Sequence, residues 1–279
     1  MLFHQRQPRP PLDRDIASIW VCKNDPRPRG LERVLPTGGA QLIVNLAEDQ
    51  TRVYRDCGLG LECHSSSGSI LSGVSTRCQI IDTDEQAHVV GVVFRPGGTL
   101  PFVAAPASLF TESDVDLGAV WDAATVGRLR ERVAAAEANG PDAMLDALEC
   151  SLIERRLHRA THPAVTYAVS RFQRRPGASR VQDVARDIGM SPKRFIERFT
   201  LDVGVTPKRF CRLLRFQQTV ARAHVGTVDW AALAQACGYF DQAHMIHDFR
   251  AFSGLSPTEY DARRTAYPNH VKFLQSVGD

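Results

Sequence analysis

The sequence lacks the features that mark membrane proteins, secreted disulfide scaffolds and several large enzyme classes. No run of 18 or more apolar residues is present, so no membrane-spanning helix is expected. The seven cysteines form no Cys-x-x-Cys pair and are odd in number, which favours reduced thiols in the cytoplasm. Residues 1–12 lack the apolar centre of a signal peptide. No Gly-x-Gly-x-x-Gly, Walker or His-Glu-x-x-His motif occurs, and no cofactor is predicted.

The C-terminal part of the sequence does contain one helical pattern, and it contains it twice. Each copy has an apolar first helix with Ala-x-x-x-Gly, a second helix with a polar face, and a Gly-x-(Ser/Thr)-Pro stop. Module one comprises residues 181–207 and module two comprises residues 230–257. Equivalent positions are 49 residues apart before the turn and 50 after it, because the second turn carries one extra residue. The pattern is typical of a helix-turn-helix.

Glycines and capping residues stand where each module must change direction. Glycine tolerates the positive φ that ends a helix sharply. The predicted turn residues are Gly189, Gly204, Gly238 and Gly254. Ser191 and Asp241 are the predicted N-caps of the second helices, because their side-chain oxygens can accept from free backbone N–H groups. Thr206-Pro207 and Ser256-Pro257 are expected to begin the helices that follow.

Charge is unevenly distributed along the chain. Residues 171–264 hold 16 Lys and Arg against 9 Asp and Glu, a net charge of +7. The whole chain carries +3, which leaves −4 for the remainder. A basic C-terminal region fits a phosphate backbone, although arginines that merely solubilise a helical domain would give the same count.

Residues 166–264 resemble the DNA-binding domain of the AraC/XylS family of bacterial transcription regulators. The resemblance is carried by the two modules, by both Gly-x-(Ser/Thr)-Pro stops and by the segment 238–260. It implies a sequence-specific, helix-turn-helix transcription factor in the cytoplasm that binds double-stranded promoter or operator DNA. RNA polymerase is a further implied partner if the protein activates transcription.

The second helix of a helix-turn-helix lies in the major groove, so residues 192–200 and 241–252 are the predicted reading helices. With Phe195, Phe199, Met245 and Phe249 facing inward, the polar side chains remain for DNA. The predicted DNA-binding residues are Ser191, Lys193, Arg194, Glu197, Lys208, Arg209, Gln242, Ala243, His244 and His247.

Each of these side chains has a specific capacity and an alternative use. Lys193 and Arg194 can donate to guanine or phosphate, and Glu197 can accept from cytosine N4 or pair with Lys193 along the helix. Gln242 suits adenine. His247 stands where the family often has arginine, which predicts weaker binding by module two, or tighter binding at low pH.

A long helix over residues 207–223 is predicted between the modules. Its seventeen residues span about 25 Å at ~1.5 Å each. A rigid spacer of this length can place two reading helices in successive major grooves, which lie about 34 Å apart. Lys208 and Arg209 at its start are predicted phosphate contacts or solvated surface charges.

The N-terminal part has the pattern of a small β-barrel or sandwich. Short Val- and Ile-rich segments occur at 41–46, 51–54, 69–71 and 88–94, separated by Gly, Asp and Ser clusters. This part resembles the cupin-like β domains of some AraC-type regulators, which implies effector binding or dimerisation. Arg95 and the turn at 96–98 are candidates for a functional edge, with a purely structural turn favoured.

The predicted fold is therefore α+β, with a β-rich sensor or regulatory domain at 1–118 and a helical linker or dimerisation segment at 119–160. The helices of that segment are expected either to dimerise the chain, which is slightly favoured, or to cover the barrel. An all-α double helix-turn-helix domain follows at 161–267, and a tail at 268–279. The effector residues are unknown. A small-molecule effector and a second copy of the chain are the further partners considered.

Two other functions stay open beside this reading. The regulator could be controlled by a protein partner instead of an effector, or a cupin-type enzyme could be fused to a DNA-binding module. The enzyme is disfavoured because His64 and His88 form no His-x-His pair, and Cys63 beside His64 is poor spacing for one metal. No cysteine cluster of an alkyl-transfer repair protein occurs either. No metal site and no catalytic residue are predicted.

Overall fold

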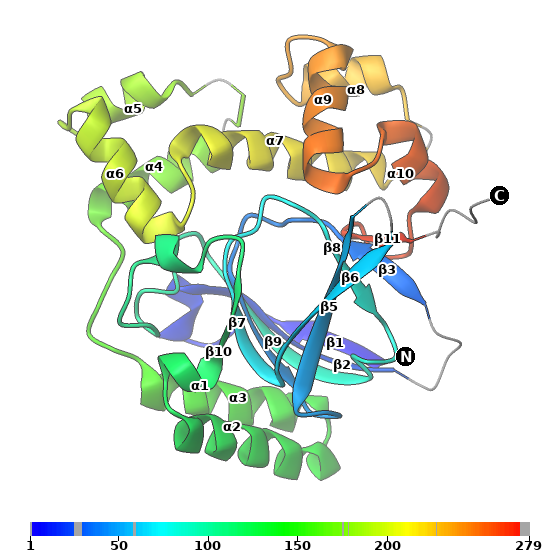
Figure 1. The fold of residues 1–279 in the computed structure, drawn as a ribbon. Coiled ribbons are helices and arrows are strands. Elements are labelled where there is room, and N and C mark those ends of the chain that lie inside the picture. The colour runs from blue at the N-terminus through cyan, green and yellow to red at the C-terminus, as the bar shows by residue number, and fades with distance from the viewer. Residues whose placement is uncertain are drawn as a thin grey trace.

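The structure is a computed structural model that describes residues 2–24, 30–57, 60–174, 176–177, 179–226 and 228–273. Its N-terminal β domain has two antiparallel sheets, of order β1-β2-β9-β4-β7-β10 and β11-β3-β8-β5-β6 (Figure 1). The strands are β1 (Leu2–Arg6), β2 (Ile16–Lys23), β3 (Leu31–Val34), β4 (Gln41–Asn45), β5 (Gln50–Asp56), β6 (Leu61–Ser67), β7 (Ser69–Ser72), β8 (Gln79–Asp82), β9 (His88–Phe94), β10 (Asp114–Asp116) and β11 (His270–Lys272).

The sequence explains the middle of the larger sheet. Strand β9 is an almost continuous apolar run, as expected for a strand buried on both faces, and it lies between β2 and β4. Gly91 in its centre leaves room for the Trp20 ring, which a Cβ atom would approach to 2.2 Å. The predicted α+β class is confirmed, and within the described residues the β domain forms two sheets and not one closed barrel.

Three α-helices cover the outside of the larger sheet (Figure 1). They are α1 (Leu117–Val120), α2 (Ala123–Ala135) and α3 (Pro141–Arg155). Gly140 separates α2 from α3 with a φ of 91°, and Leu145, Leu148 and Leu152 of α3 are fully buried. These helices thus complete the core of the β domain. Short 3-10 helices are η1 (Leu12–Arg14), η2 (Ala107–Phe110) and η3 (Ala136–Asn139).

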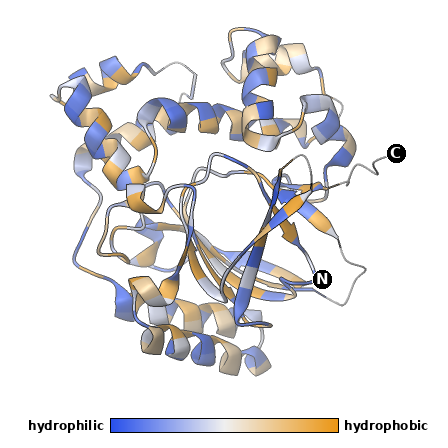
Figure 2. Cartoon of the chain, viewed as in Figure 1, coloured by the Kyte–Doolittle hydropathy of each residue, from blue (hydrophilic) through white to orange (hydrophobic). Residues whose placement is uncertain are grey.

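In its described residues, the C-terminal domain is built from helices. Its helices are α4 (Pro163–Arg174), α5 (Val181–Asp187), α6 (Pro192–Val203), α7 (Pro207–Ala223), α8 (Trp230–Ala236), α9 (Gln242–Ser253) and α10 (Pro257–Arg263). Hydrophilic and apolar residues alternate around the helices in Figure 2, so each helix buries one side. The helices lie across one end of the β domain, with α7 running between the two modules (Figure 1).

After α10 the chain returns to the β domain. Strand β11 pairs antiparallel with β3, with His270 opposite Val34 and Lys272 opposite Glu32. The Phe273 N–H donates to the Leu31 carbonyl at 2.9 Å, and the His270 ring lies 2.8 Å from the Glu32 carboxylate. The predicted tail therefore adds a strand to the first domain, and residues 274–279 lie outside the described residues. The other domain boundaries stay predictions.

Candidate DNA-binding surface

Module one is built around aromatic packing. The Ser191 side chain accepts from the Arg194 N–H at 3.4 Å and begins α6, with Pro192 at its first position. Phe195 and Phe199 are fully buried. The Phe199 ring lies 5.9 Å from Phe172 of α4 and 5.6 Å from Phe210 of α7. The reading helix is thereby held against two neighbouring helices by its apolar side.

The opposite side of α6 is free. Lys193, Arg194 and Glu197 are exposed. Within the part of the chain that the structure describes, no ion pair joins Lys193 to Glu197, so the intrahelical alternative for Glu197 finds no support. Gly189 before the helix and Gly204 after it have φ of 68° and 97°, the conformation that a glycine turn provides.

Module two repeats the same frame with a different anchor. The Asp241 side chain accepts from the His244 N–H at 2.7 Å and begins α9. Asp248 is only 1% exposed and lies 2.7 Å from Arg212 and 3.5 Å from Arg215 of α7. The second reading helix is thus fixed to α7 by a buried carboxylate between two guanidinium groups. Gly238 and Gly254 also have positive φ.

Tyr239 shapes the surface beside α9. Burial, followed by the nearby Asp248 carboxylate, raises the pKa of Tyr239, so its ring is a neutral phenol at pH 7. The Arg215 guanidinium lies 5.1 Å from this ring, and the His244 ring meets it edge-on at 5.3 Å. His244 is therefore half-buried against Tyr239, and its predicted contact with DNA competes with this packing.

The exposed face of α9 carries one residue that sequence reasoning missed. Gln242, Ala243 and His247 are exposed, as expected for the reading side. Arg250 is also exposed, and it follows Ala243 and His247 at the i+7 and i+3 positions of the same helical stripe. Helical spacing from those two residues could have identified it.

The two predicted phosphate-binding cations at the start of α7, Lys208 and Arg209, lie in different surroundings. The Thr206 side chain accepts from the Arg209 N–H at 3.4 Å and caps the helix. Lys208 is exposed. Arg209 lies 3.5 Å from the Glu112 carboxylate of the β domain, so part of its charge is already paired. Lys208 is the more available of the two for a phosphate.

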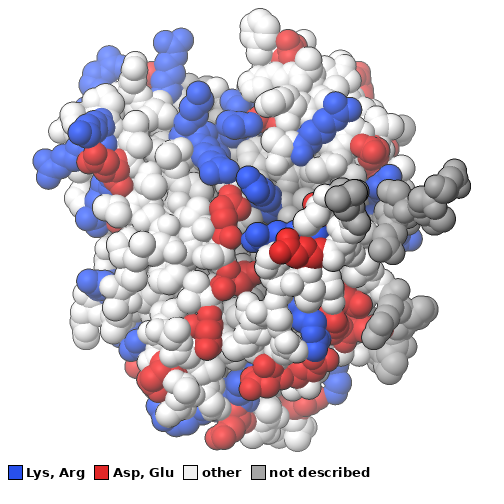
Figure 3. Space-filling view, viewed as in Figure 1, with Lys and Arg blue, Asp and Glu red and all other residues white. Residues whose placement is uncertain are grey.

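The electrostatic contrast between the domains is visible in Figure 3. Lys and Arg gather over the upper half of this face, where the helical modules lie, and a hollow separates the two lobes. Asp and Glu are frequent over the lower half, on the β domain. Such a distribution favours a polyanion at the helical end of the molecule.

Metal ligands do not cluster in the described residues. They contain no group of three or more His, Cys, Asp or Glu side chains that could hold a metal ion. Across the same residues, the longest apolar helices fall short of what is needed to cross a membrane. The turn after β9 is structural at Gly98, where a Cβ would meet the Asp15 carbonyl at 1.9 Å.

Two family models match separate parts of the chain. Residues 4–116 match a family described as a domain of unknown function (DUF6597). Residues 184–263, which contain α6 to α10, match a family described as a helix-turn-helix domain. No curated protein is significantly similar to the chain.

Several solved structures are also similar. The DNA-binding domain of AdpA in complex with a target DNA shares 22% identity over 36% of this chain and 92% of its own, with a TM-score of 0.34. An AraC-type transcriptional regulator from Chromobacterium violaceum shares 22% identity over 36% of this chain and 90% of its own, with a TM-score of 0.34. ToxT from Vibrio cholerae shares 13% identity over 93% of this chain and 98% of its own, with a TM-score of 0.48.

Proposed function

We propose that this chain, which carries an AraC-type helix-turn-helix domain in its C-terminal part, is a sequence-specific transcription regulator that reads two successive major grooves. The observation that carries the proposal is the repeated module, in which α6 and α9 each bury one face and expose a polar reading face. DNA-binding transcription regulators are not a class of enzymes. That this chain has no catalytic activity remains a prediction from its sequence.

Module one supplies the charged contacts. Lys193 and Arg194 near the start of α6 are placed to donate to guanine O6 and N7 or to phosphates, because the first turns of a reading helix approach the base edges. Glu197, one turn later, accepts from cytosine N4. Ser191 and Lys208 flank this face at the starts of α6 and α7 and contact the phosphate backbone.

Module two supplies more neutral contacts. Gln242 reads adenine through its amide, and Ala243 touches a thymine methyl group. His247 and Arg250 lie further along the same stripe, where a phosphate or a guanine can be reached. The seventeen residues of α7 separate the modules by about 25 Å at ~1.5 Å per residue. This length is of the same order as the groove repeat of about 34 Å.

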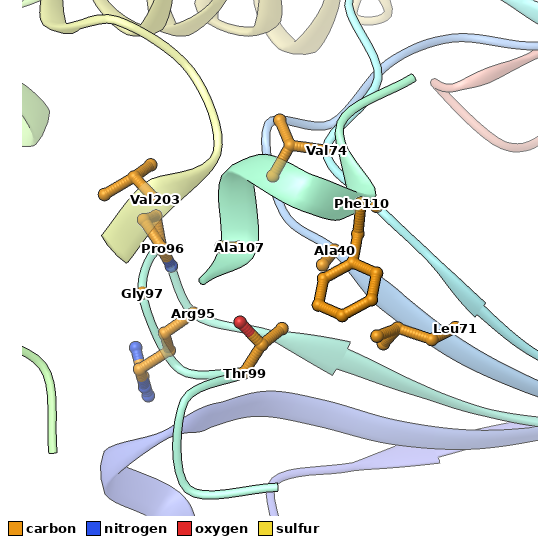
Figure 4. A pocket seen from close by; sticks show the side chains of 11 residues that line it. Ala40, Leu71, Val74, Arg95, Pro96, Gly97, Thr99, Ala107, Phe110 and Val203 are labelled. Carbon is orange, nitrogen blue, oxygen red and sulfur yellow. The ribbon is translucent and has the colours of Figure 1, made fainter. Parts of the chain in front are cut away.

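The β domain is proposed to sense an effector or to dimerise the protein. The β-domain loops that meet the end of α6 enclose a pocket with room for about one water molecule, lined by Ala40, Leu71, Phe110, Thr99 and Val203 among others (Figure 4). An effector would therefore have to widen this pocket or bind elsewhere on the β domain. The Thr99 hydroxyl is buried there without a hydrogen-bond partner. Control by a protein partner is the alternative, and RNA polymerase is a partner if the regulator activates transcription.

Fluorescence anisotropy of the full chain tests the DNA proposal. The chain is titrated with DNA from upstream of its own gene and with a scrambled duplex at several salt concentrations. We expect tighter binding to the native duplex and a steep loss of affinity with salt. Arg194→Ala should weaken native binding by about 1–3 kcal/mol, the value of a good base contact. Equal binding of wild type to both duplexes, or an unaffected variant, would contradict the proposal.

A further inference from the structure

The two reading helices share one further property, which is that both end on the β domain. The C-terminal ends of α6 and α9 point toward the sheets, and their N-terminal ends point away from them (Figure 1). The N-terminal ends hold the exposed Lys193 and Gln242, which face the solvent. The β domain therefore contacts both helices at their C-terminal ends, which lie opposite the ends proposed to meet DNA.

The contact with α6 centres on its terminal glycine. The Thr111 hydroxyl donates to the Gly204 carbonyl at 2.6 Å. A Cβ atom on Gly204 would lie 3.3 Å from the Thr111 Oγ1 and 3.4 Å from the Ala107 carbonyl, so the glycine fits closely against η2 and its following turn. Glu112, the next residue, lies 3.5 Å from Arg209 of α7.

The contact with α9 is made at the equivalent place by different residues. The Arg33 Nη1 and the Cys78 thiol both donate to the Ser253 carbonyl, at 3.3 and 3.1 Å. Arg33 is 9% exposed and is held in turn by Asp56 at 3.0 Å. A Cβ on Gly254 would come within 2.6 Å of the Arg33 Nη1. A cation at a helix C-terminus also meets the negative end of the helix dipole.

The glycines at the two contacts, Gly204 and Gly254, lie 50 positions apart in the repeat, and the β-domain residues that meet them lie on separate elements. Thr111 follows η2, whereas Arg33 belongs to β3 and Cys78 precedes β8. Between them, Gln217 in the middle of α7 donates to the Pro36 carbonyl at 2.6 Å, and Leu35 is buried against Leu213 and Phe216. The separation of the two helix ends is thus fixed by the β domain as well as by α7.

We infer that the β domain sets the spacing between the two DNA segments that the chain accepts, and that Thr111 and Arg33 are positioning residues for this selection. The inference rests on the proposed function, because spacing matters only if both helices read one duplex. Neither residue meets DNA. Each acts through the carbonyl at the end of a reading helix, so its loss changes how firmly that helix is held and leaves the reading side chains intact.

The test measures spacing tolerance, which a merely stabilising residue would not alter. Duplexes are selected from a random library with the wild-type chain, and one or two base pairs are then inserted between the two protected segments. Two inserted pairs shift the second segment by about 7 Å and turn it by about 70°. We expect wild type to lose affinity about tenfold or more, a loss comparable to one or two base mismatches.

The double variant Thr111→Val with Arg33→Gln should bind the original duplex more weakly and lose less than about threefold on insertion, below the effect of one mismatch. The single variant Thr111→Val should lie between the two, and it carries the test alone if the double variant does not fold. Thr83→Val is the matched control, since Thr83 donates to the Gly30 carbonyl at 3.1 Å within the β domain.

The outcomes separate the two proposals. If wild type selects no sequence, the proposed function fails. If wild type selects a sequence and all variants show the same loss on insertion as wild type, the function stands and the positioning role of the β domain is wrong. Equal loosening by the Thr83→Val control would also overturn it, because general destabilisation would then explain the result.

Discussion

The two modules follow one sequence pattern but are held in place by different forces. In module one, Phe195, Phe199 and Val203 belong to the same apolar core as the β domain and α3. In module two, the apolar side chains fall into two smaller clusters, one around Phe249 and one around Met245. Module one is therefore a continuation of the main core, whereas module two packs in smaller, separate clusters, the larger of which also includes Leu35 and Val271.

Equivalent positions make the difference specific. Arg198 of module one is partly exposed and pairs with Asp202 within its own helix, at 3.2 Å. The matching residue of module two is Asp248, which is buried between two arginines of α7. Similarly, Arg209 pairs with Glu112 of the β domain, whereas the matching Glu259 accepts hydrogen bonds from Ser256 and caps its own helix. The same sequence pattern is therefore held by apolar packing in module one and by a buried carboxylate in module two.

Removing the buried charge should give the largest effect. Asp248→Ala leaves Arg212 and Arg215 without their shared partner inside the molecule, and it should lower the free energy of unfolding of module two by about 3 kcal/mol. Hydrogen exchange of α8 and α9 measures the change. Arg198→Ala, at the same position of module one, should cost only about 1 kcal/mol or less, because Arg198 is partly exposed and the buried Asp202 has a second donor.

The comparison fails if the two variants are equally destabilised. Asp202 keeps the His162 N–H at 3.0 Å in the Arg198→Ala variant, so no buried carboxylate is left without a donor there. Exchange in α5 and α6 should be unchanged by Asp248→Ala, which provides an internal reference within one measurement.

A charge placed on the second reading helix should give an intermediate effect. His247→Arg adds a permanent cation to module two, and we expect affinity to rise several-fold and the salt slope to steepen by about one. Anisotropy at several salt concentrations measures both effects. An affinity and a salt slope that are unchanged in the variant would contradict a DNA contact at this position.

The self-capping of module two predicts the smallest effect. The Ser256 backbone N–H, followed by its hydroxyl, lowers the pKa of Glu259 below its ordinary value of 4.5. The stabilisation by Glu259 is therefore full above the unfolded pKa and is lost as pH falls through the lower folded pKa. The stability difference between wild type and Glu259→Gln, followed by thermal unfolding, should be present near neutral pH and shrink as the pH falls below the ordinary pKa of 4.5. A difference that grows on acidification would contradict this assignment.

Features that depend on neighbouring residues were predicted correctly from the sequence. A helix cap, a turn glycine and an inward-facing pair each depend on residues within about four positions, and these recur at Ser191, Gly204 and Phe195 as expected. The class of the fold follows from the same local patterns. The DNA-contact assignments, in contrast, stay predictions, because an exposed side chain does not reveal which base it meets.

What sequence reasoning missed depends on residues far apart in the chain. The pairing of Arg209 with Glu112 and the burial of Asp248 both require knowledge of which elements meet in space. Strand β11 has three residues, too few for an alternating pattern to be recognised, and its partner β3 lies more than two hundred positions earlier. Arg250 is the exception, since local helical spacing would have included it.

Strand β11 also determines when the smaller sheet is completed during synthesis of the chain. The smaller sheet begins with residues made early in synthesis, but among the described residues it is 270–272, made after both modules, that cover the edge of β3. Until then β3 presents unpaired backbone groups that can pair with other chains. A chain truncated after α10 would contain both modules and leave this edge of β3 open.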